Sequence, residues 1–140
     1  MKKKLYWILF VMLAWGSAGC SSRAAEITCT VEWRSDVSLD AEERETVVLR
    51  DVEGAESVTL RDLSFHAEYQ PGNEVRMRSL RVWVTPPVGS PELMTQVYDL
   101  PKDSGPTDQF LETGFTGKTL FYNPDPLSDS ILQYYCSVSG

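Results

Sequence analysis

Hydrophobic and polar residues alternate one by one between residues 27 and 34, where the apolar positions are Ile27, Cys29, Val31 and Trp33. Successive side chains of a β-strand point to opposite faces, so a period of two is typical of a half-buried strand. The pattern therefore predicts a strand over residues 27–34 with Cys29 on its inward face.

The same period recurs along the chain, with β-branched and aromatic residues at the apolar positions. Further strands are predicted at residues 45–50, 58–69, 75–84, 93–98, 118–122 and 131–138, and residues 110–113 are a short strand or a helical turn. Residues 35–44 are expected to be mostly irregular. In the last strand, the predicted inward positions are Leu132, Tyr134, Cys136 and Val138.

The strand predicted at residues 58–69 contains a change of parity. The inward residues have even numbers up to Leu60 and odd numbers from Leu63 onward. A one-residue shift within a strand indicates a β-bulge. We therefore expect a bulge near Arg61 and Asp62.

The segment QPGNE, residues 70–74, predicts a hairpin loop because Pro71 and Gly72 favour a tight reversal. Pairing Tyr69 with Val75 across this loop places oppositely charged residues opposite each other, such as Glu68 and Arg76. In this register Val75 and Met77 point inward, followed after a slip at Ser79 by Leu80, Val82 and Val84.

Seven or eight short strands separated by turn signals predict an all-β fold. No internal repeat and no amphipathic helix stands out after residue 26. The simplest architecture is an antiparallel Greek-key sandwich of the immunoglobulin-like kind. A small β-barrel is the alternative.

The N-terminus has a different pattern. Lys2, Lys3 and Lys4 precede an apolar run over residues 5–15, and residues 16–19 are small. This order is the layout of a secretory signal peptide, and the run is shorter than the roughly 20 apolar residues of a membrane-spanning helix. We expect a helical signal peptide that is cleaved; a buried N-terminal helix is the alternative.

The residues Ser17, Ala18, Gly19 and Cys20 resemble the lipobox of bacterial lipoproteins, although Ser17 stands where that family usually has leucine. The resemblance implies a diacylglycerol on the Cys20 sulfur, cleavage just before Cys20 and acylation, typically with palmitate, of the new amino terminus. Signal cleavage after Ala24, without lipid, is the alternative. With Ser21 next to the cysteine, the resemblance further implies the outer membrane of a Gram-negative cell, facing the periplasm.

These signals divide the chain into three parts. Residues 1–19 are the expected lipoprotein signal peptide, residues 20–26 the lipidated N-terminus and tether, and residues 27–140 the β-sandwich domain. A domain of this length buries one modest core.

Export changes the charge of the protein. Loss of Lys2, Lys3 and Lys4 reduces the 13 basic residues to 10, against 20 acidic residues, so the mature chain carries a formal charge of about −10. An acidic chain lacks the electrostatic footprint of a nucleic-acid-binding protein. Its net charge also argues against attraction to an anionic membrane.

Three cysteines are an odd number for an exported protein. Lipidation of Cys20 leaves Cys29 and Cys136 to form a disulfide in an oxidising compartment. Two buried thiols are the alternative.

Other candidate sites are weaker. Two loops carry aspartates that are candidate calcium ligands, namely Asp99, Asp103 and Asp108 in one loop and Asp125 and Asp129 in the other. Solvated turn aspartates explain the same pattern. A partner surface for a carboxylate or sugar acid is the hypothesis for Arg76, Arg78, Arg81 and Trp83, although charge pairing across strands explains the same arginines. Trp83, Tyr122 and Tyr135 fall on predicted solvent faces, either as exposed aromatics or under loops.

His66 is the only histidine, and no nucleophile with a base and no carboxylate pair is identifiable. The sequence therefore predicts a non-enzymatic lipoprotein without a cofactor. It is expected to be held by lipid on Cys20, with a structural or interaction role toward another envelope protein. A module that binds calcium or carbohydrate is the alternative.

Overall fold

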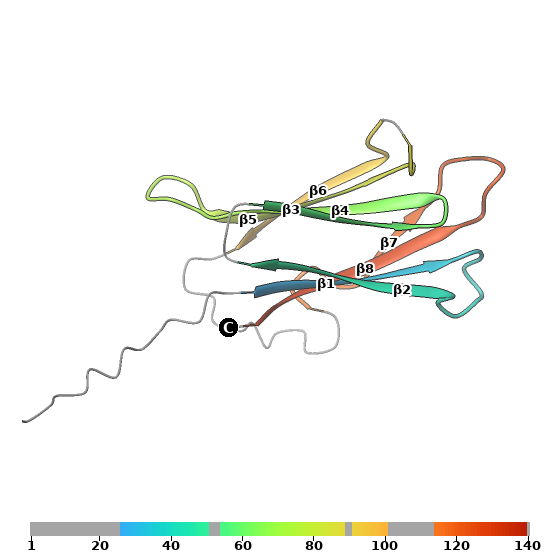
Figure 1. The fold of residues 1–140 in the computed structure, drawn as a ribbon, viewed down its shortest axis with the longest axis horizontal. Helices are drawn as coiled ribbons and strands as arrows, with labels where there is room; N and C mark the ends of the chain where they lie inside the picture. The colour runs from blue at the N-terminus through green and yellow to red at the C-terminus, as the bar shows by residue number, and fades with distance from the viewer. Residues whose placement is uncertain (1–25, 51–53, 89–90, 101–113, 140) are drawn as a thin grey trace, which may run out of the picture.

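The structure, a computed structural model, describes residues 26–50, 54–88, 91–100 and 114–139. These residues form eight strands: β1 (Glu26–Arg34), β2 (Glu43–Arg50), β3 (Gly54–Leu60), β4 (Leu63–Gln70), β5 (Arg78–Thr85), β6 (Met94–Leu100), β7 (Thr119–Tyr122) and β8 (Ile131–Ser139). Two antiparallel four-stranded sheets pack face to face (Figure 1). The predicted β-sandwich is therefore confirmed.

The connectivity is simpler than that of an immunoglobulin domain. One sheet has the order β3-β4-β5-β6 and is a plain meander. The other has the order β2-β1-β8-β7, in which the first and last hairpins of the domain are joined by pairing of β1 with β8. The chain passes from one sheet to the other after β2 and again after β6.

The core lies between the sheets and contains the inward residues that alternation predicts. Leu80, Val82 and Val84 of β5 are fully buried, as are Leu132 and Tyr134 of β8. The Phe65 and Tyr134 rings meet across the core, with their centroids 5.1 Å apart. Burial of these apolar side chains is the main stabilising contribution to the sandwich.

The predicted disulfide is present between Cys29 and Cys136. The two residues are directly opposite each other in the β1–β8 ladder, with a Cα–Cα distance of 4.0 Å, and both are fully buried. The bridge spans 107 residues of sequence. It therefore ties the first strand of the sandwich to the last.

The prediction of a bulge near Arg61 and Asp62 is wrong. These two residues form a tight hairpin turn between β3 and β4, with Leu60 paired to Leu63. A two-residue turn places the residues on either side of it on the same face, which accounts for the change of parity. Arg61 has a positive φ of 53°, in the left-handed region that the tightest hairpin turns require.

The register predicted for the β4–β5 hairpin is also wrong. Tyr69 pairs with Leu80 rather than with Val75, so the loop is longer than expected and occupies residues 71–77. Val75 and Met77, expected inside, are 92% and 57% exposed.

The loops gather at two opposite ends of the sandwich (Figure 1). The proximal end contains the start of β1 at Glu26 and the loop at residues 71–77. The distal end contains the β1–β2, β3–β4, β5–β6 and β7–β8 connections, which are residues 35–42, 61–62, 86–88 with 91–93, and 123–130.

Candidate functional site

Asp62, in the β3–β4 turn, joins the distal connections of both sheets. One of its oxygens, Oδ1, accepts a hydrogen bond of 2.7 Å from the indole N–H of Trp33 in β1. The other, Oδ2, accepts hydrogen bonds from the β7–β8 loop: Asn123 Nδ2 at 2.8 Å, Ser128 Oγ at 2.9 Å and Ser130 Oγ at 2.6 Å. Both carboxylate oxygens are therefore used to hold the two sheets together at this end.

The hydrogen bonds keep Asp62 ionised. Burial alone would raise the pKa of the carboxyl group, but donation from Ser130, Ser128 and Trp33 outweighs burial and lowers the pKa below its ordinary value of 3.8. Four side-chain donors hold this carboxylate in a fixed position between the two sheets.

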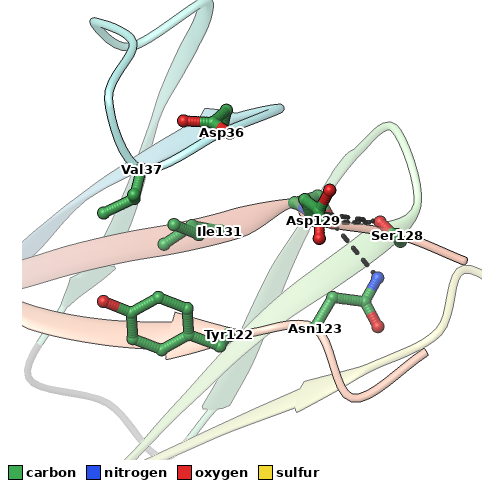
Figure 2. Close-up of a pocket in the computed structure, with 8 residues that line it drawn as sticks. Asp36, Val37, Tyr122, Asn123, Ser128, Asp129 and Ile131 are labelled. Atoms are coloured by element: carbon green, nitrogen blue, oxygen red, sulfur yellow. Dashed lines mark hydrogen bonds between the residues drawn. The ribbon is translucent and has the colours of Figure 1, made fainter. Parts of the chain in front are cut away.

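Beside this network lies an open hollow of about 330 Å³ (Figure 2). Its apolar floor is Ile131, which points to the outer face of the β1–β8 sheet and is only 1% exposed. Val37 and Tyr122 lie on either side of Ile131. The polar part of the lining consists of Asp36, Asn123, Ser128, Asp129 and Ser130.

Exposed apolar and acidic residues surround the hollow. Val37 is 58% exposed and Tyr122 is also 58% exposed, and Leu127 at the tip of the β7–β8 loop is 94% exposed. Hydrogen bonds from the Ser38 hydroxyl and backbone N–H lower the pKa of Asp36. The described residues of the distal connections contain seven acidic residues and one basic residue, Arg61.

In the described part of the chain, no group of three or more His, Cys, Asp and Glu residues is arranged to hold a metal ion. His66, the single histidine, lies elsewhere, on the outer face of the other sheet. There its Nε2 is 2.9 Å from Thr85 Oγ1, and burial lowers its pKa.

The aspartates considered as calcium ligands are not brought together. Asp99 lies near the proximal end of β6, opposite Ser79, whereas Asp125 and Asp129 lie in the distal β7–β8 loop. Asp103 and Asp108 lie outside the described residues. The convergence of two acidic loops, which the hypothesis required, is therefore not found for the three aspartates that the structure describes.

The four residues considered as a partner surface divide into two groups. Arg81 and Trp83 lie on the outer face of the meander sheet, where the Arg81 guanidinium is 4.6 Å from the Trp83 ring centroid. His66 also stacks on Trp83, at 5.0 Å, and Arg81 pairs with Glu92 at 2.6 Å.

Arg76 and Arg78 lie elsewhere. Arg76 is in the proximal loop, and Arg78 begins β5 on the same side of the strand as Leu80. A continuous stripe of three arginines is therefore not formed.

Of the aromatic residues predicted on solvent faces, Tyr122 is exposed and lines the hollow, whereas Trp83 and Tyr135 are half-buried. Sequence reasoning did not identify Asp62 as a site residue. Its hydrogen-bond partners are 29 to 68 positions away in the sequence, so no local pattern indicates them.

Comparison with known proteins finds no match to a protein-family model, to a curated protein or to a solved structure. Within the described ranges, no helix is long and apolar enough to span a membrane.

Proposed function

We propose that this protein is a lipid-anchored protein of the bacterial cell envelope, and that its β-sandwich presents the distal end to another envelope protein as a non-enzymatic interaction module. The observation that carries the proposal is the arrangement of the two ends. The predicted lipid site, Cys20, precedes β1 by a few residues, and the acidic and apolar distal loops lie at the far end of that strand.

Simple chain geometry supports this orientation. The six steps from Cys20 to Glu26 extend to at most about 20 Å, so the proximal end stays close to the bilayer. β1 has nine residues and rises by about 30 Å, which carries the distal loops away from the surface. Two or three acyl chains are sufficient for stable anchoring without a membrane-spanning helix.

Metabolic labelling with a palmitate analogue tests the anchor. The wild-type protein is expected to take up label and to sediment with membranes, and Cys20→Ala is expected to lose the label. An unlabelled wild-type protein in the soluble periplasmic fraction would contradict the anchor.

A photo-crosslinking residue tests the interaction surface. It is placed at Leu127 of the distal end and, as the matched control, at Val48 on the outer face of β2, which is 41% exposed. A discrete adduct at position 127 that is absent at position 48 supports the distal site. Equal adducts at both positions, or none at position 127, count against it.

A further inference from the structure

The proximal loop at residues 71–77 has a fixed conformation. The Asn73 side chain accepts hydrogen bonds from the backbone N–H groups of Val75, at 2.9 Å, and Arg76, at 2.8 Å. The Asn73 N–H donates to the Arg76 carbonyl at 2.9 Å. At Gly72 the backbone passes so close that a Cβ atom would lie 2.6 Å from the Arg76 carbonyl oxygen and 2.7 Å from the Arg78 nitrogen.

This turn exposes apolar side chains. Val75 is 92% exposed and Met77 is 57% exposed, on a loop that projects beyond the two sheets at the proximal end (Figure 1). The turn holds Val75 outward, so the exposure is part of the folded structure. Exposed apolar residues at the tip of an ordered loop are a feature of interaction surfaces.

One basic side chain lies between these apolar residues. Arg76 lies between Val75 and Met77 and offsets the charge of Glu74, so residues 71–77 are formally neutral, and Arg78 already belongs to β5. No ion pair joins the Arg76 guanidinium to a carboxylate among the described residues. The tip therefore places one guanidinium group between two exposed apolar side chains.

The β7–β8 loop at the distal end provides a direct comparison. Leu127 is 94% exposed at its tip, but its charged neighbours are Asp125 and Asp129. Both tips therefore expose an aliphatic side chain, but the distal tip is acidic and the proximal tip is formally neutral. An anionic lipid surface repels the acidic tip and does not repel the neutral one.

We propose that the loop at residues 71–77 is a second membrane contact, which places Val75 and Met77 in the headgroup region of an anionic phospholipid bilayer and Arg76 against lipid phosphates. The proposal rests on the proposed lipid anchor for its orientation, since that anchor brings the proximal end to the bilayer. Arginine binds phosphate bidentately, and aliphatic residues partition into the boundary between headgroups and acyl chains.

The net charge of the protein does not oppose this contact. Electrostatic attraction to a membrane decays within a Debye length, about 8 Å at physiological salt, so the charges next to the bilayer dominate. The loop is too small to hold the protein on a membrane alone. With the chain already anchored, loop insertion is an intramolecular step that benefits from a high effective concentration.

The experiment uses an environment-sensitive fluorophore on a single introduced cysteine. Cys29 and Cys136 are joined in the disulfide, and Cys20 is blocked if it is lipidated, so the new thiol is the one that reacts. The variants are Val75→Cys and, as the matched control, Leu127→Cys. The full mature protein is reconstituted in vesicles of phosphatidylcholine alone or of an equimolar mixture of phosphatidylcholine and phosphatidylglycerol, with and without brominated acyl chains.

The fluorophore at position 75 is expected to shift to shorter wavelength and to be quenched by brominated lipid at least about twofold more than the fluorophore at position 127. The difference is expected to be larger in anionic vesicles. Adding Arg76→Glu is expected to weaken insertion into anionic vesicles about fivefold or more, since one basic residue near such a surface contributes roughly that factor.

Three results would overturn the proposal. The first is equal quenching at positions 75 and 127. The second is unchanged quenching in anionic vesicles after Arg76→Glu. The third is a fluorescence change at position 75 that appears with added envelope protein and not with lipid, which would identify a protein partner in place of the bilayer.

The same samples separate this proposal from the proposed function. Vesicle flotation and the mass of the N-terminal peptide report whether Cys20 carries lipid. Flotation with an unquenched position 75 retains the anchor and rejects the loop contact. If Cys20 carries no lipid, the anchor is rejected, and mixing the soluble labelled chain with the same vesicles still tests the loop.

Discussion

At the residue scale, Asp62 carries the most concentrated set of interactions at the distal end. Its four donors come from β1 and from the β7–β8 loop, whereas Asp62 itself belongs to the β3–β4 turn. Hydrogen bonds to a charged acceptor contribute more than neutral ones, typically about 1.5 to 3 kcal/mol each before other costs are counted. A single carboxylate therefore fixes loops of both sheets.

Asp62→Asn is expected to lower the free energy of unfolding by about 1 to 3 kcal/mol, because the amide nitrogen faces donors in place of an acceptor. Urea denaturation at neutral pH measures the change. Asp129→Asn, in the same region but exposed, is the control and is expected to change stability by less than about 0.5 kcal/mol. Equal effects of the two variants would contradict the role assigned to Asp62.

The same variant predicts a pH dependence. The pKa of Asp62 is lowered on folding from its ordinary value of 3.8, so its contribution to stability is complete above the unfolded pKa and is lost as the pH falls through the folded pKa. The stability difference between wild type and Asp62→Asn is therefore expected to be constant near neutral pH and to shrink below about pH 4. A stability difference between wild type and Asp62→Asn that grows as the pH falls would contradict this prediction.

Substitutions at the two glycines before β7, Gly114 and Gly117, test two different constraints on the backbone. Gly114 and Gly117 both have positive φ, 63° and 65° respectively. A Cβ atom added at Gly114 would lie 1.9 Å from the Cys136 carbonyl oxygen, whereas a Cβ atom added at Gly117 would have no neighbouring atom within 4 Å. Gly117→Ala is expected to cost about 1 to 2 kcal/mol, from the left-handed backbone alone. Gly114→Ala is expected to cost about 3 kcal/mol or more. Thermal denaturation of both variants checks the order, and a larger effect at Gly117 would refute the close approach.

At the element scale, alternation predicted β1 and β8 well because the inward residues of both strands are apolar and nearly all of them are buried. With Cys29 and Cys136 both inward, the bridge was predictable from parity and from the cysteine count. The β3–β4 hairpin could not be predicted in this way, because Arg61 occupies a left-handed backbone position at which glycine or asparagine is the usual sequence signal.

The β4–β5 hairpin shows a second reason for failure. Val75 and Met77 continue an apolar alternation but are exposed, and the charges opposite Glu68 fit more than one register. In the structure Glu68 pairs with Arg81. The predicted register also placed an arginine opposite Glu68, but that arginine was Arg76. The Asp62 network was beyond prediction because its partners come together only in the folded chain.

The disulfide is predicted to stabilise the pairing of the first and last strands. Replacing both cysteines, Cys29→Ala with Cys136→Ala, avoids a free thiol and is expected to cost about 2 to 5 kcal/mol, since the bridge closes a loop of 107 residues. Denaturant unfolding of the exported protein measures the loss. A double variant as stable as the wild type would show that the β1–β8 ladder needs no covalent support.

At the scale of the whole molecule, the two ends of the sandwich have different chemistry. The distal end carries the hollow, exposed apolar residues and a large excess of carboxylates. The proximal end carries the start of β1 and a loop in which Arg76 lies between the exposed Val75 and Met77. If lipid on Cys20 holds the chain, the short tether keeps the loop at residues 71–77 near the bilayer and directs the acidic loops toward the periplasm.

The most direct test is the intact mass of the protein extracted from membranes with detergent. We expect a chain that begins at Cys20, carries a diacylglycerol and an additional acyl chain, and is two hydrogens lighter than its reduced form because Cys29 and Cys136 are joined. A mass without lipid, for a chain that begins beyond Cys20 at Ala25, would contradict the anchor and with it the orientation proposed for the molecule.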